Sequence, residues 1–201
     1  MLYELNSATG TAFQVGGNYP STMYALATDV PEVADPTVVV AALLPGSRSV
    51  QVGDTATVFV SIVNGGLFEA FGCAISPVNV LDATFSYQTT DSATNMLTGS
   101  PNTPADIGAG GLQTYVVSIT PNSPMAPTDV SFDFGCSNAP AADVVTGVNT
   151  LLLVASAEPV PDVIALAATI PDPGIVNLPG TMGPSALAVA TPNAGVDRPV
   201  P

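Results

Sequence analysis

Short segments in which apolar and polar residues alternate run through the middle of the chain. A period of two is that of a β-strand with one face in a core and the other in water. The predicted strands lie at residues 36–45, 54–64, 71–76, 83–88, 111–120, 129–136 and 149–156. Seven short strands separated by turn residues, within residues 35–157, are the pattern of an immunoglobulin-like β-sandwich, so we predict an all-β fold.

The alternation also predicts which side chains face the core. It turns Phe71, Cys73 and Ile75 inwards on the third strand, and Phe134 and Cys136 inwards on the sixth. The two cysteines are therefore expected to meet across the core. A disulfide there would close a loop of about 63 residues and add about 4 kcal/mol in the chain-entropy model. Two buried thiols that never pair are the alternative, but a loop-rich β chain favours the disulfide.

Residues 1–34 form a separate N-terminal segment. Alternating stretches at residues 2–5 and 11–15 flank Asn-Ser-Ala-Thr-Gly, whose residue types favour a tight turn, so a β-hairpin is predicted. The motif LYELNSATGTAFQVGG resembles one blade of bacterial β-propeller repeats. The resemblance covers about 27 residues, and a propeller needs at least about four blades to close.

Residues 158–201 repeat the beginning of the sandwich. Both copies start at an acidic residue beside a proline and run through apolar residues into a proline turn. Each ends at Asn followed by Gly or Ala and then Gly, and the spacing from Pro36 to Asn64 is close to that from Pro161 to Asn193. We interpret this as an internal repeat whose second copy holds only the first two strands of a sandwich.

Two strands with an apolar face are not stable alone, so this C-terminal extension needs a partner. It could fold back on its own sandwich, pair with the N-terminal hairpin, or add its strands to a neighbouring molecule. We favour strand addition, because a contact that does not close propagates into a filament. The residues expected in the assembly strands are Val163, Ile164, Leu166, Ile170, Leu187 and Val189.

Residues 35–193 resemble the tandem Ig-like repeats of large bacterial surface and secreted proteins. The resemblance rests on SRSVQVG and TATVFVSIVN, followed by a core cysteine. It implies a sandwich fold and an extracellular or cell-surface location, and it implies no catalytic residues. The N-terminus lacks the basic region and apolar core of a signal peptide, so either a leader has been removed or the chain is a segment of a longer protein.

Composition narrows the function further. The chain has 16 acidic residues, two arginines, no lysine and no histidine, for a net charge of −14. Such a charge disfavours binding to nucleic acid, and the apolar runs are too short for membrane insertion. Without histidine there is no Ser-His-Asp triad and no imidazole metal ligand, so we do not expect an enzyme.

One weak candidate for a metal site lies in the linker before the sandwich, and no other cofactor is expected. Asp29, Glu32 and Asp35 could supply oxygen ligands to Ca²⁺, although a solvated linker is the favoured interpretation. The sequence thus predicts an extracellular structural subunit that assembles with copies of itself. The alternative is a spacer, or a glycan- or Ca²⁺-binding module, of a larger bacterial surface protein.

Overall fold

The computed structural model describes residues 2–5, 12–15, 38–168 and 188–196, and the chain divides into two units, residues 1–34 and 35–201. In the first unit, β1 (Leu2–Leu5) and β2 (Ala12–Val15) form an antiparallel hairpin. This is the hairpin that the turn residues between the two stretches predict. The second unit holds the sandwich and the C-terminal extension, with no division at residue 157.

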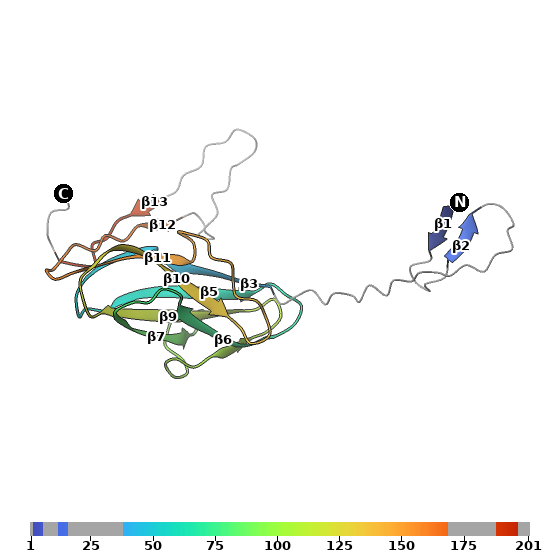
Figure 1. Ribbon diagram of the computed structural model, residues 1–201, viewed down its shortest axis with the longest axis horizontal. Coiled ribbons are helices and arrows are strands. Elements are labelled where there is room, and N and C mark those ends of the chain that lie inside the picture. Colours follow the sequence, from blue (N-terminus) through green and yellow to red (C-terminus); the bar gives the residue numbers. More distant parts are fainter. Residues whose placement is uncertain (1, 6–11, 16–37, 169–187, 197–201) are drawn as a thin grey trace, which may run out of the picture. The chain divides into compact units, whose positions relative to one another are not determined.

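The second unit is built on a sandwich of two sheets (Figure 1). Its strands are β3 (Val39–Leu44), β4 (Ser47–Gln51), β5 (Ala56–Asn64), β6 (Ala70–Pro77), β7 (Ala83–Thr90), β8 (Ala105–Ile107), β9 (Leu112–Pro121), β10 (Met125–Gly135) and β11 (Thr150–Ser156). One sheet has the order β3-β5-β9-β7 and the other β4-β11-β10-β6-β8. When β4 and β8 are set aside and the other seven strands are lettered in chain order, the two sheets have the A-B-E-D and G-F-C arrangements of the immunoglobulin sandwich. The described residues contain no helix, and the fold is all-β, as predicted.

Two of these strands were not predicted. β4 carries a single buried apolar residue, Val50, and β8 is three residues long, so neither is long enough for alternation to show. β3 and β4 belong to different sheets, and the chain crosses between them at Pro45, which follows a cis peptide bond. β4 then runs parallel to β11, whereas the other paired strands in the sandwich are antiparallel.

The core lies between the two sheets and is filled by the residues that alternation turns inwards on β5, β9 and β10. Each of these side chains is at most 1% exposed: Ala56, Val58, Val60, Ile62, Tyr115, Val117, Ile119, Val130, Phe132 and Phe134. Burying one large apolar side chain contributes about 1.5–3 kcal/mol, so these rows dominate the stability of the sandwich.

Phe71 is an exception to the predicted alternation. The pairing of β6 with β8 shifts between Ala70 and Cys73, both fully buried, and Gly72 between them has a φ of +57°. This β-bulge inserts an extra residue and reverses the alternation on its N-terminal side. Phe71 is consequently 47% exposed, and the prediction that it faces the core is wrong.

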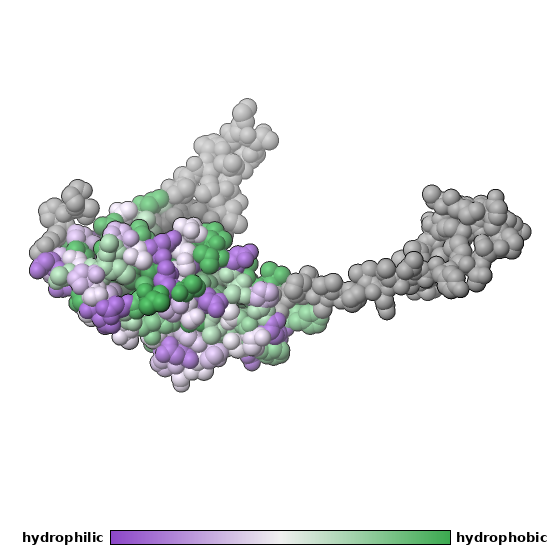
Figure 2. Space-filling model, in the orientation of Figure 1, coloured by the Kyte–Doolittle hydropathy of each residue, from purple (hydrophilic) through white to green (hydrophobic). Residues whose placement is uncertain are grey.

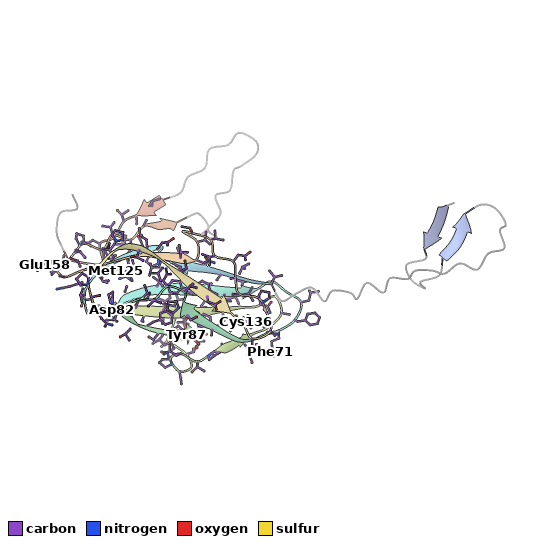
Figure 3. The ribbon with its side chains drawn as sticks, in the orientation of Figure 1. Phe71, Asp82, Tyr87, Met125, Cys136 and Glu158 are labelled. Carbon is purple, nitrogen blue, oxygen red and sulfur yellow. A yellow bond between two sulfur atoms is a disulfide. The ribbon has the colours of Figure 1, made fainter. Side chains whose placement is uncertain are left out.

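Cys73 and Cys136 form the predicted disulfide, but the bond does not cross the core. β6 and β10 are neighbours in one sheet, and the register that pairs Ala74 with Gly135 places the two cysteines opposite each other. The prediction of a link between the two sheets is therefore wrong. Figure 3 shows Cys136 near Phe71, at the end of the sandwich away from Met125.

Candidate assembly site

The C-terminal extension is a second antiparallel hairpin. β12 (Leu166–Ala168) pairs with β13 (Ala188–Ala190), as Figure 1 shows, and Val163 forms a further antiparallel bridge to Asn193. The two-stranded extension predicted from the sequence is thus present. Its pairing can be compared directly with that of β3 and β5, the pair it was predicted to repeat.

In the sandwich, this pair ends in a particular turn. Val39 lies opposite Asn64, and the Gly65 backbone nitrogen donates to the Val38 carbonyl at 2.7 Å. The side-chain oxygen of Asn64 accepts a hydrogen bond from the Gly66 nitrogen at 3.0 Å. An asparagine that bonds two residues ahead mimics a backbone turn, which fixes the point where β5 ends.

The extension has the same set of bonds. Val163 lies opposite Asn193, and the Ala194 nitrogen donates to the Asp162 carbonyl at 2.7 Å. The side-chain oxygen of Asn193 accepts from the Gly195 nitrogen at 3.1 Å. The repeat predicted from sequence spacing is therefore matched in backbone geometry, with Val163 corresponding to Val39 and Asn193 to Asn64.

The two asparagines differ in what covers them. Asn64 is fully buried, and its amide nitrogen donates to the carbonyls of Phe68, Ile107 and Gly108 at 2.7, 3.0 and 3.2 Å. Asn193 is exposed, and its amide nitrogen donates to the nearby Val196 carbonyl instead. In the sandwich, the end of β8 encloses this corner; among the described residues, nothing equivalent encloses the corner of the extension.

An ion pair anchors the base of the extension to the sandwich. Nε of Arg48 lies 2.7 Å from one carboxylate oxygen of Asp162, and the other oxygen accepts from the Ser49 backbone nitrogen at 2.8 Å. The two side chains are only 11% and 3% exposed, and Arg48 also donates to the carbonyl and hydroxyl of Thr57. Because breaking a buried pair leaves one charge uncompensated, this contact resists separation of the extension from β4.

Close backbone packing adds to the anchor. A side chain at Gly195 would overlap the Val160 carbonyl oxygen and place its Cβ 2.7 Å from the Asp162 nitrogen. The Val196 nitrogen donates to the same Val160 carbonyl at 3.2 Å. A cavity of about 240 Å³ lies beside this contact, lined by both the sandwich and the base of the extension.

The predicted assembly residues lie on this extension where the structure describes them. Those residues are Val163, Ile164, Leu166 and Val189. Val163 is 39% exposed and Val189 is 59% exposed, so apolar surface remains uncovered on both segments. In the described part of the chain, β13 pairs with β12 and with no other strand. Ile170 and Leu187 lie outside the described residues.

The calcium candidates Asp29, Glu32 and Asp35 also lie outside the described residues. Within the ranges that the structure covers, no three His, Cys, Asp or Glu side chains are grouped so that they could hold a metal ion. The same ranges contain no helix of the length and hydrophobicity needed to cross a membrane.

The anchor between Arg48 and Asp162 was missed from the sequence. The partners are 114 residues apart. Arg48 lies in the SRSVQVG stretch and Asp162 is the acidic residue that opens the second copy of the repeat, but neither pattern links one to the other. The one signal in the sequence that could have indicated the anchor is the scarcity of basic residues: charged residues make up 9% of the chain, and only two of them are basic. An arginine retained within a β-strand of such a chain is a candidate for a specific carboxylate partner.

No protein-family model matches the chain, and no curated protein matches it. Among solved structures, it is similar to a family 123 glycoside hydrolase from Clostridium perfringens, described for glycolipid glycan hydrolysis, with a TM-score of 0.37 and 10% identity. The match covers 59% of this chain and 27% of that one. A likeness at this level supports no conclusion about function.

Proposed function

We propose that this chain is an extracellular structural subunit that assembles with copies of itself by β-strand addition at the C-terminal hairpin. One observation carries the proposal. The hairpin repeats the pairing of β3 with β5, yet β13 has no second neighbour among the described residues. In the sandwich, β5 pairs along its other edge with β9, from Ala56 to Val63. A strand from a neighbouring copy would take the place of β9.

Strand addition suits the properties of this edge. An unpaired strand edge presents a row of backbone donors and acceptors to an incoming strand, and backbone hydrogen bonds supply affinity. Exposed Val189, on the strand that the added strand would pair with, provides apolar surface for the added strand to cover. The anchor between Arg48 and Asp162 supports the proposal, since a preorganised acceptor loses less conformational freedom on binding.

The extracellular location rests on the disulfide and on the resemblance to bacterial surface repeats. Disulfides form and persist in oxidising compartments and are rare in the cytosol. A net charge of −14 keeps a chain with 47% hydrophobic residues in solution until specific contacts form.

The test compares two exposed valines. Val189→Lys places a charge on the β13 edge, whereas Val80→Lys makes the same change in a loop, where Val80 is fully exposed. We expect the unchanged chain and the Val80→Lys variant to form concentration-dependent oligomers or filaments, seen by light scattering and negative-stain electron microscopy. The Val189→Lys variant should form neither filaments nor the open-ended series of oligomers that repeated strand addition produces. An unchanged chain that is monomeric at every concentration, with and without Ca²⁺, would contradict the proposal.

A spacer within a larger surface protein is the second candidate, and the anchor is the observation that favours it. A buried ion pair at the base of the extension would stiffen the junction between consecutive Ig-like units of one chain. Deleting residues 158–201 separates these functions from ligand binding. The deletion should abolish assembly under the first proposal, whereas binding of a glycan or Ca²⁺ by the remaining sandwich would persist.

A further inference from the structure

Apolar residues are exposed at many places on the described surface (Figure 2). Strand pairing places one group of them next to one another on adjacent strands. On the outer face of the four-stranded sheet, side chains from β3, β5 and β9 lie side by side in two rows. The rows are Leu44, Phe59 and Val116, and Val40, Val63 and Leu112. The exposed fractions of Leu44, Phe59, Val40 and Leu112 are 67%, 49%, 52% and 53%.

This face also differs from the opposite one in charge. β3, β5, β7 and β9 contain no charged residue. On the other sheet, exposed Asp106, Asp129 and Asp133 lie on β8 and β10. The sandwich therefore has one acidic outer face and one uncharged outer face, on which the two apolar rows lie, in a chain with a net charge of −14.

We propose that the uncharged face of the four-stranded sheet packs against the same face of a second copy of this chain. Two copies that each carry −14 repel when their acidic sides meet, and the uncharged face is where they approach without opposing carboxylates. A cationic partner would be drawn to the acidic face instead. A contact made by the same surface on both copies closes as a two-fold dimer, with the sheets about 10 Å apart.

The size of the face sets the strength of the dimer. Four strands about 4.8 Å apart and about eight residues long at about 3.4 Å per residue cover roughly 500 Å². A pair would bury about 1,000 Å², the lower limit for a specific interface. The dimer is therefore weak and reversible. It lies on a different surface from the hairpin, so it goes beyond strand addition and would join chains side by side.

The experiment uses two matched double variants in a chain that already carries Val189→Lys, so that strand addition at β13 does not contribute. Phe59→Thr with Leu112→Thr changes the face. Phe71→Thr with Leu67→Thr makes the same chemical changes elsewhere, at side chains 47% and 72% exposed. Sedimentation equilibrium should show dimers in the parent and in the control, and at least about tenfold weaker association in the face variant.

Ionic strength provides a second measurement that needs no further substitution. Association through an uncharged face should strengthen as the salt concentration rises from about 20 mM to about 500 mM, because salt screens the repulsion between the negatively charged surfaces of the two copies. A parent chain that stays monomeric up to about 1 mM overturns the proposal. Equal weakening in the face variant and the control overturns it as well, as does association that weakens with salt.

Discussion

Tyr115 shows how a single buried residue couples the core to pH. Its side chain is fully buried, and its hydroxyl donates to the Cys73 carbonyl at 3.5 Å. Burial raises the pKa of Tyr115 well above its usual range, and the nearby Tyr87 raises it further. In the unfolded chain the same phenol ionises near pH 10. Above that pH the folded state holds a proton that the unfolded state has lost, so stability falls as the pH rises.

We therefore expect Tyr115→Phe to flatten the alkaline decline in stability. The parent should lose up to about 1.4 kcal/mol per pH unit through this residue above pH 10, and the variant should not. At pH 7 the loss of a long hydrogen bond should cost less than about 1 kcal/mol. Urea unfolding at pH 7 and pH 11 measures both effects, and equal pH slopes in the two proteins would contradict the assignment.

For individual residues, the sequence predicted most of the core positions and one important contact, the disulfide. Inward positions on β5, β9 and β10 followed from alternation, because a regular strand alternates without interruption. Phe71 did not follow, since the bulge at Gly72 is a backbone event that the apolar pattern does not record. Pairing of Cys73 with Cys136 was predictable from their number and phase, but their placement in one sheet depended on strand order.

The C-terminal hairpin carries the proposed assembly site, and the close approach of Gly195 to residues 160–162 at its base can be tested by substitution. Gly195→Ala would place a methyl group against the Val160 carbonyl and the Asp162 nitrogen. We expect the segment around residue 195 to move away from residues 160–162. The Ala194 and Val196 amides, which donate to Asp162 and Val160, should then exchange with solvent at least about tenfold faster.

The control for this prediction is Gly108→Ala, because nothing lies within 4 Å of a Cβ at Gly108 and its φ is not in the left-handed region. This variant should leave exchange at Ala194 and Val196 unchanged, and both variants should preserve the protection of β9 and β10. Unchanged exchange at these two amides in Gly195→Ala would mean that the extension does not need the close approach at residue 195.

Elements were predicted where the pattern was long enough and missed where it was not. The repeat of residues 36–64 at 161–193 predicted the hairpin, and its hydrogen bonds match those of the first copy. Neither β4 nor β8 could be predicted, because five residues with one buried apolar side chain and a strand of three residues give no period. The crossing of the chain from one sheet to the other at Pro45 was likewise not predicted, because tertiary packing determines it.

The two sheets of the sandwich differ in charge. Asp106, Asp129 and Asp133 lie on one sheet, whereas the strands of the other contain no charged residue. Alternation predicted a sandwich, but it assigned no strand to a particular sheet, so the separation of acidic and uncharged faces became visible only with the strand order. The candidate site has the same dependence on long-range arrangement, since β4 and residue 162 meet only in the folded chain. The sequence predicted the C-terminal hairpin of the site, but neither β4 nor the pairing of Arg48 with Asp162.

The arginine content offers a way to measure how the whole molecule opens. With no lysine, trypsin can cut only after arginine, and Arg198 precedes a proline, which blocks cleavage there. The remaining bond follows Arg48 in β4, whose side chain is 11% exposed and paired with Asp162. Because β4 is hydrogen-bonded to β11 along its length, cleavage requires the strand to leave the sheet.

Replacing both cysteines, as Cys73→Ala with Cys136→Ala, tests whether that opening is global. The disulfide spans 63 residues and links β6 to the residue that follows β10, so it does not involve β4. Its loss should cost about 4 kcal/mol in the chain-entropy model. If trypsin cuts only the unfolded population, cleavage should accelerate by about the same factor as unfolding becomes more favourable, on the order of 1,000-fold. If β4 detaches locally, the cleavage rate would stay the same while urea stability falls. Local detachment is expected here, because β4 is an edge strand with one paired neighbour and one buried apolar residue, Val50, so that releasing it disrupts fewer contacts than opening both sheets.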